Sequence, residues 1–168
     1  MSVPFAVHKY DDDLSSCFMG SNMLCAELYH IIRGKVVDGV GEGSKYVSLY
    51  QEVLTRILGI VPYPGTLNIK LSVEEAQKVK QILQKSICIY FITPPGNAYC
   101  KAYAWKAYVR ARGKCIRAYI VKPEKTIYGD DVVELLSEVY LRGALDLRTG
   151  DEIELLITSN CLNPCGCP

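Results

Sequence analysis

The segment at residues 62–71, Pro-Tyr-Pro-Gly-Thr-Leu-Asn-Ile-Lys-Leu, constrains the fold more than any other part of the chain. Two prolines and a glycine cannot continue a helix, so they force a turn at 62–65. The residues that follow alternate with a period of two, which predicts a strand at 66–71. One face of that strand is apolar, and the other presents Thr66, Asn68 and Lys70. A hydroxyl, a carboxamide and an ammonium group in a row indicate a site for phosphate oxygens or a metal ion.

The composition predicts one folded domain. The chain has 168 residues, of which 49% are hydrophobic, enough for a core and too many for general disorder. No apolar run reaches the length of a membrane span, and the N-terminus lacks the pattern of a signal peptide. We therefore expect a cytoplasmic protein with no membrane partner. Residues 1–25 are expected to form a peripheral extension, 26–159 the folded domain and 160–168 a cysteine-rich tail.

The charge distribution leaves two interpretations open. The net charge of +1 identifies no partner, but residues 101–128 carry eight basic side chains against Glu124 alone. Residues 129–154 reverse this, with eight acids against two arginines. A basic stretch that includes aromatic residues is typical of nucleic-acid binding. The alternative is a solvated hairpin face packed beside an acidic one.

Eight cysteines are a high count for a chain without a secretion signal. Because intracellular disulfides occur in proteins of hyperthermophiles, a thermophilic source fits this composition. Three of the cysteines, Cys161, Cys165 and Cys167, lie in the C-terminal tail. Their spacing does not match paired zinc-binding motifs, so a disulfide or a free tail is favoured over a metal site.

The remaining patterns predict a mainly β fold with inserted helices. Ser48 and Gly59 are expected to begin and end a first helix, and Ser72 with Glu75 forms a capping box for a second. Residues 132–136 fit either a strand or a helix, and 141–145 a short helical turn. Six or seven strands that do not alternate regularly with helices favour a small barrel over a doubly wound sheet. The other expected strands are 24–37, 86–93, 102–111, 114–121 and 152–158, and the middle pair forms a hairpin around Arg112-Gly113.

A glycine-rich segment, 39–44, precedes the first helix and reads Gly-Val-Gly-Glu-Gly-Ser. Backbone N–H groups of such a loop can approach phosphate oxygens, because no Cβ obstructs them. The segment lacks the lysine of the Walker A loop, and Ser44 stands where the dinucleotide fingerprint needs its third glycine. It therefore indicates a nucleotide site outside the common fingerprints.

These stretches occur together in an order that resembles the archaeal CTP-dependent riboflavin kinase family. The glycine-rich segment, a helix closing on Leu58-Gly59, and Pro-Tyr-Pro-Gly-Thr-Leu-Asn at 62–68 follow one another as in that family. The second half agrees at 121–126, 133–134 and 141–151, so the resemblance runs from about Glu27 to Thr158. It implies a six-stranded cradle-loop β-barrel that transfers phosphate from CTP to the 5′-hydroxyl of riboflavin, giving FMN and CDP.

The resemblance also implies roles for individual residues. Thr66 and Asn68 would hold Mg²⁺, and Thr126 and Glu134 would contact the flavin. The family usually has a histidine where this chain has Tyr128. The nucleotide-binding residues would be Gly39, Val40, Gly41, Glu42, Gly43, Ser44, Val139, Tyr140, Leu141 and Arg142.

Three hypotheses about chemistry follow. The first is that Glu134 orients or deprotonates the attacking hydroxyl. The second places a nucleic-acid-binding regulator of the same barrel architecture on the basic stretch, although we expect no nucleic-acid partner. The third is a flavin carrier without kinase activity, which the glycine-rich segment opposes because a carrier needs no triphosphate cradle. The preference for CTP over ATP rests on the resemblance alone.

Overall fold

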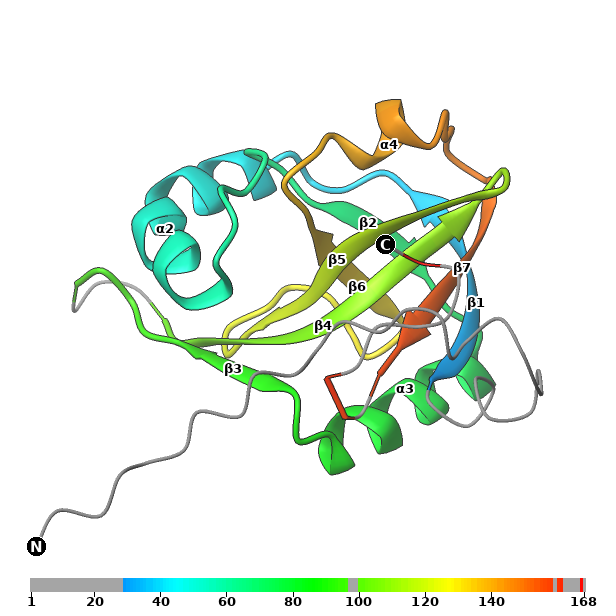
Figure 1. Cartoon of the computed structure of the whole chain (residues 1–168), viewed down its shortest axis with the longest axis horizontal. Coiled ribbons are helices and arrows are strands. Elements are labelled where there is room, and N and C mark those ends of the chain that lie inside the picture. Colours follow the sequence, from blue (N-terminus) through cyan, green and yellow to red (C-terminus); the bar gives the residue numbers. More distant parts are fainter. Residues whose placement is uncertain (1–28, 97–99, 159, 162–166, 168) are drawn as a thin grey trace, which may run out of the picture.

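The structure is a computed structural model that describes residues 29–96, 100–158, 160, 161 and 167. The predicted mainly β fold is confirmed, because seven strands and three helices make up the described part (Figure 1). The strands are β1 His30–Val37, β2 Leu67–Lys70, β3 Ile89–Ile92, β4 Ala102–Ala111, β5 Lys114–Pro123, β6 Val132–Leu136 and β7 Glu152–Ile157. The helices are α2 Gly43–Leu58, α3 Val73–Lys85 and α4 Leu141–Ala144.

Six of the strands close into a ring. The order is β4-β5-β6-β2-β1-β7, and β7 pairs back onto β4, with every pairing antiparallel. The long strand β4 closes the ring because its second half pairs with β7, while its first half pairs with β3. This arrangement confirms the six-stranded architecture that the sequence predicted. Residues 132–136, left open between strand and helix, are a strand between β2 and β5.

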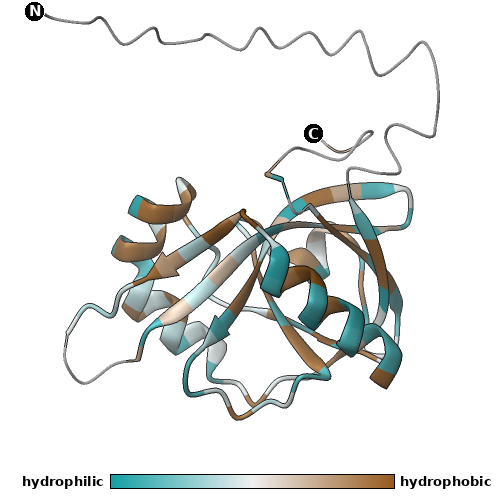
Figure 2. Ribbon diagram, turned by 90° about the horizontal axis from the view of Figure 1, so that it is seen from below, coloured by the Kyte–Doolittle hydropathy of each residue, from teal (hydrophilic) through white to brown (hydrophobic). Residues whose placement is uncertain are grey.

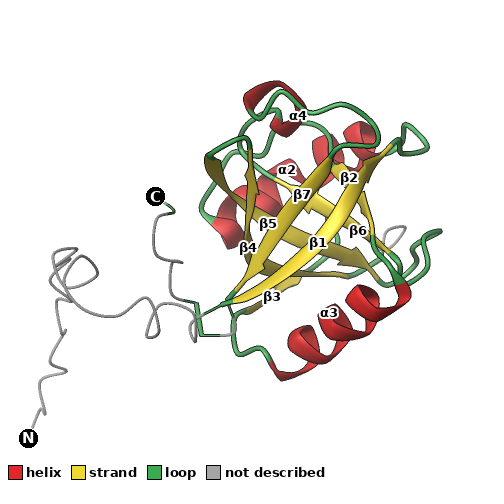
Figure 3. Cartoon of the chain, turned by 90° about the vertical axis from the view of Figure 1, so that its right-hand side faces the viewer, coloured by secondary structure: helices red, strands yellow, loops and turns green. Residues whose placement is uncertain are grey.

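Two hydrophobic cores lie on opposite sides of the strands. The first fills the ring and includes Ile69, Leu135 and Leu155, with Ala76 and Val79 of α3 packed against one end. The second lies between α2 and the outer face of β3, β5 and β6, and includes Leu54, Tyr119 and Leu136. Figure 3 shows α3 on one side of the strands and α2 and α4 on the other. Figure 2 shows α3 with its hydrophilic residues toward solvent.

Local sequence signals explain several element boundaries. The Ser72 side chain accepts a hydrogen bond from the Glu75 backbone N–H at 3.1 Å, which confirms the predicted cap of α3. The β4–β5 hairpin turns at Arg112 and Gly113, whose φ angles of 50° and 72° are those of a two-residue type I′ turn. The short helical turn predicted at 141–145 is α4.

The predicted start of the first helix was wrong. Helix α2 begins at Gly43 with Glu42 as its N-cap, so Ser48 lies inside the helix and is exposed. Glycine is a poor helix former, so a segment with three glycines favours a loop by local propensity, although Gly43 begins the helix here. The end of the helix was predicted correctly, since Gly59 takes a left-handed φ of 70° as its C-cap.

The opposite charges of residues 101–128 and 129–154 pair with one another. Arg112 contacts Asp151 at 3.0 Å, and Arg117 contacts Glu138 at 3.3 Å. Further pairs join Arg110 to Glu154 and Lys122 to Asp130. The aromatic residues of the basic hairpin do not form an exposed stacking surface, because Trp105, Tyr108 and Tyr119 are buried. The charge pattern is thus a hairpin packed beside acidic segments, and the nucleic-acid interpretation loses its aromatic platform.

Among the described residues, two disulfides join the C-terminal tail to β5 and to the residue before β3. Cys161 bonds Cys88, and Cys167 bonds Cys115. This agrees with the preference for a disulfide over a metal site, and in the described residues no group of three His, Cys, Asp or Glu side chains could hold a metal ion. Cys165 and the predicted extension at 1–25 lie outside the described residues. In the part of the chain that the structure describes, no helix has the length and apolar character needed to cross a membrane.

Candidate active site

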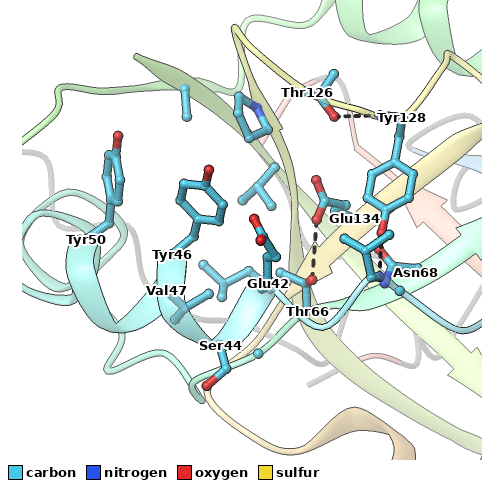
Figure 4. Close-up of a pocket in the computed structure, with 18 of the residues that line it drawn as sticks. Glu42, Ser44, Tyr46, Val47, Tyr50, Thr66, Asn68, Thr126, Tyr128 and Glu134 are labelled. Carbon is cyan, nitrogen blue, oxygen red and sulfur yellow. Dashed lines mark hydrogen bonds between the residues drawn. The ribbon is translucent and has the colours of Figure 1, made fainter. Parts of the chain in front are cut away.

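A cavity of about 600 Å³ opens between α2, the outer face of the ring and two loops. The loop at 38–42 joins β1 to α2, and the loop at 124–131 joins β5 to β6. The cavity gathers the whole glycine-rich segment 39–44, Thr66, Asn68, Thr126 and Glu134 (Figure 4). Gly39 and Glu134, which are 95 positions apart in the sequence, therefore meet in one space.

The strand register places the polar groups of the cavity side by side. Asn68 on β2 lies directly opposite Glu134 on β6 and opposite Val37 on β1. Glu134 in turn lies opposite Val121 on β5. Because side chains alternate along a strand, Val133 and Leu135 point into the ring while Glu134 points outward into the cavity. The predicted apolar face of β2 is confirmed, since Leu67, Ile69 and Leu71 are all buried.

Two glycines let the glycine-rich segment lie against these polar side chains. A Cβ on Gly39 would overlap the carboxamide of Asn68, and a Cβ on Gly43 would lie 2.7 Å from Thr66 Oγ1. A larger residue at either position would force the Asn68 or the Thr66 side chain to move. Glycine at 39 and 43 therefore lets the segment lie directly against Asn68 and Thr66.

The N-terminus of α2 faces the cavity, and the side chain of its N-cap residue does not cap it. Glu42 makes no side-chain hydrogen bond to the helix, and the first turn contains no acidic residue. The backbone N–H groups of the first turn of an uncapped helix lack intrahelical partners, and the helix dipole makes this end attractive to anions. Gly43 and Ser44, predicted to be loop residues, thus contribute as the first turn of a helix that suits phosphate.

Thr66, Asn68 and Glu134 form a partly buried polar group. The Thr66 hydroxyl donates to Glu134 Oε1 at 3.4 Å. Asn68 is 7% exposed, and its Oδ1 has no hydrogen-bond partner among the described residues. Burial raises the pKa of the Glu134 carboxyl, and the hydrogen bond from Thr66 opposes this shift. An unpartnered buried oxygen is costly and calls for a ligand.

The loop at 124–131 brings a second pair of polar side chains to the cavity. The Thr126 hydroxyl accepts a hydrogen bond from the Tyr128 backbone N–H at 3.1 Å, which leaves its own proton free to be donated. The Tyr128 hydroxyl accepts a hydrogen bond from the Val40 backbone N–H at 3.2 Å across the cavity. This role of Tyr128 is not predictable from the sequence, because a contact across 88 residues has no local signal.

The segment 139–142 meets the cavity only in part. Tyr140 and Arg142 line it, and Arg142 donates to Asp38 Oδ1 at 3.0 Å and to the Val37 carbonyl at 3.2 Å. Leu141 packs in the ring core, and Val139 does not line the cavity. The predicted nucleotide contacts of these last two residues therefore stay predictions that their side chains do not support.

One half of the cavity is apolar, and no local sequence pattern predicts this. Its walls come from the buried face of α2, from β3, β4, β5 and β6, and from Cys100 just before β4. The helical spacing of Tyr50 and Leu54 indicated a buried face, but not what that face covers. The residues that form this half are Val47, Tyr50, Leu54, Ile92, Cys100, Ala102, Val121 and Leu136.

Comparison with known proteins agrees with the motifs. A family profile described as a domain of unknown function, DUF120, and labelled as CTP-dependent riboflavin kinase, matches residues 36–157. A riboflavin kinase of Aeropyrum pernix is 35% identical over 125 residues, which cover 73% of this chain and 92% of that protein. A riboflavin kinase of Thermofilum pendens is 34% identical over 151 residues, which cover 87% of this chain but 64% of that longer protein. One of Pyrobaculum islandicum is 39% identical over 128 residues, covering 75% and 59%. The resemblance seen in the motifs is thereby confirmed, and the chain belongs to the CTP-dependent riboflavin kinase family.

Proposed function

We propose that this protein phosphorylates riboflavin at its 5′-hydroxyl with CTP as donor, releasing FMN and CDP. The observation that carries the proposal is the single cavity that joins an anion-binding helix start to Thr66, Asn68, Thr126 and Glu134. The riboflavin kinase relatives support it independently. Phosphoryl transfer depends mainly on positioning and on neutralising charge, and the cavity offers groups for both tasks.

The two halves of the cavity suit the two substrates. The polar half, with the glycine-rich segment and Arg142, suits the phosphates of a nucleotide. The apolar half, between α2 and β5, suits the flat ring system of a flavin. Glu134 and Thr126 line the same cavity, and we propose that the hydroxyl acceptor and the terminal phosphate meet beside them.

Glu134 has the surroundings of a general base. Its raised pKa makes the carboxylate a better proton acceptor than an exposed glutamate, and it remains ionised only above that pKa. Thr66 holds one carboxylate oxygen at 3.4 Å, which leaves the other free for the substrate hydroxyl. We infer that Glu134 orients this hydroxyl and accepts its proton.

The residues present fit a divalent cation, which we propose is Mg²⁺. Asn68 Oδ1 is a buried oxygen that has no hydrogen-bond partner within the described part of the chain. The Thr66 hydroxyl directs its proton to Glu134, so the lone pairs of Thr66 Oγ1 are available. Both are neutral oxygen ligands, which suits Mg²⁺ carried in by the nucleotide phosphates better than binding by protein alone. When bound, the ion would neutralise phosphate charge beside the glycine-rich segment.

The deciding experiment incubates the protein with riboflavin, Mg²⁺ and each of CTP, ATP, GTP and UTP in turn, and separates the products by chromatography. We expect FMN and CDP with CTP, and little FMN with the other three. FMN made equally from ATP would contradict the CTP preference. Riboflavin binding without FMN from any nucleotide, including at high temperature, would favour the flavin carrier.

A further inference from the structure

The base of the loop at 124–131 is fixed to the rest of the barrel. The Glu124 N–H donates to the Lys101 carbonyl at 2.9 Å, and the Asp131 carbonyl accepts from the Leu71 N–H at 2.7 Å. The Asp130 carboxylate contacts both Lys80 and Lys122, at 3.4 Å and 3.1 Å. Anchors at both ends mean that the middle of this loop is presented from a defined position.

The glycine-rich segment, by contrast, has little support of its own. Val40 is 61% exposed, and a Cβ placed on Gly41, where φ is +82°, would meet no atom within 4 Å. Within the described part of the chain, residues 39–41 make one hydrogen bond, from the Val40 N–H to the Tyr128 hydroxyl. Glycines lose more conformational freedom on ordering than other residues, so a segment of this kind is costly to fix.

We propose that Tyr128 is a positioning residue that holds the glycine-rich segment in the conformation that receives the nucleotide phosphates. This inference rests on the proposed function. The phenol arrives from an anchored loop and fixes Val40 before the nucleotide binds, so less ordering remains for binding itself.

The contact also links the two halves of the cavity. The Tyr128 backbone N–H donates a hydrogen bond to Thr126, which we place beside the flavin. The Tyr128 hydroxyl accepts a hydrogen bond from the glycine-rich segment, which we place around the phosphates. Figure 4 shows the Tyr128 side chain reaching from the Thr126 side of the cavity toward the glycine-rich segment. The fit is tight, since a Cβ on Gly39 would lie 3.3 Å from the Tyr128 hydroxyl.

The test replaces Tyr128 with phenylalanine, which keeps the ring and removes the hydroxyl. Binding of Mg²⁺–CTP is measured by calorimetry without riboflavin, and the KM values of both substrates are measured separately. We expect CTP to bind about fivefold more weakly, the factor that one neutral hydrogen bond contributes. The kcat value and the KM for riboflavin should stay within twofold of wild type. Unchanged CTP binding would overturn the inference, and so would tighter binding, which would mean that the phenol competes with phosphate.

Two further variants separate this role from general packing. Tyr103→Phe removes a hydroxyl on β4 from a ring that contacts Phe91 and Trp105, and it should bind CTP as wild type does. Tyr128→His offers an acceptor on a shorter side chain, so we expect it to lose the contact with Val40 and to behave like Tyr128→Phe. Full affinity in the histidine variant would contradict the hydrogen-bond mechanism.

The state of the loop itself can be followed without catalysis. Amide exchange of Val40, measured by NMR in the free protein, should accelerate in Tyr128→Phe because the N–H loses its partner. If the wild-type protein binds CTP but makes no FMN, the proposed kinase function fails while the role of Tyr128 is still decided by these binding measurements. If it binds no nucleotide at all, both proposals fail.

Discussion

Replacing Glu134 with glutamine tests the chemistry of the cavity with almost no change in shape. The carboxamide keeps an oxygen that can accept from Thr66, but it cannot accept a proton from the substrate hydroxyl. General bases contribute about 10²–10⁴-fold to a rate, and a loose phosphoryl-transfer transition state places this case at the lower end. We therefore expect kcat to fall about 100-fold, which corresponds to about 2.7 kcal/mol of activation free energy.

The same substitution should raise stability at neutral pH. Burial raises the pKa of Glu134 above 4.5 in the folded protein, so the charged form is disfavoured by folding. The protonated form of Glu134 contributes its full stability below the pKa that this residue has in the unfolded protein. This contribution is lost as the pH rises through its pKa in the folded protein. The glutamine variant stays neutral, so its melting temperature should exceed that of wild type at pH 7.5. The difference should vanish near pH 4.

The assay for this prediction combines FMN formation at saturating substrates with thermal unfolding between pH 4 and pH 8. In the wild-type enzyme, kcat should decline as pH falls through the raised pKa of Glu134, because the base must be ionised. Glu152→Gln, an exposed change on β7, is the matched control and should alter neither quantity. Near-normal kcat in Glu134→Gln, with normal riboflavin binding, would refute the base role. A lower melting temperature at pH 7.5 would refute the burial argument.

Three other substitutions test the remaining parts of the structure. Gly39→Ala places a methyl group on the carboxamide of Asn68, at an overpacking cost of about 1–3 kcal/mol. We therefore expect the affinity for CTP, measured by calorimetry, to fall roughly tenfold or more. Unchanged affinity would contradict the close approach of Gly39 to Asn68. Asn68→Leu keeps the side-chain size but removes the oxygen, so the Mg²⁺ concentration for half-maximal activity should rise while the fold persists. An identical dependence of activity on Mg²⁺ would exclude Asn68 as a metal ligand. Cys161→Ser removes the disulfide to Cys88, whose two cysteines are 73 residues apart in the sequence. The free energy of unfolding, measured in urea without reductant, should fall by about 4 kcal/mol. Equal stability would contradict a stabilising role for this disulfide.

Some of the fold could be predicted from the sequence because its signals are local. The alternation at 66–71, the two-residue turn at Arg112-Gly113 and the Ser72 cap of α3 each depend on neighbours within a few positions. Residues 132–136 carried no such signal. They became a strand because β2 and β5 lie on either side of them in the ring. The start of α2 also needed tertiary context, because Gly43 is held against Thr66 at a point where local propensity disfavours a helix.

The candidate site also combines features that local sequence determines with features that only the tertiary structure decides. The sequence by itself determined the kinds of group present: a glycine-rich segment, the oxygens of Thr66 and Asn68 on one strand face, and a lone carboxylate at Glu134. Only the tertiary structure decided that Asn68 lies opposite Glu134, that Tyr128 bonds to Val40, and that α2 adds an apolar wall. The physical reason is the separation of the interacting residues along the chain. Periodicity and turn chemistry depend on residues within a few positions of one another. The register of a closed ring and the docking of a helix depend on packing between segments far apart in the chain.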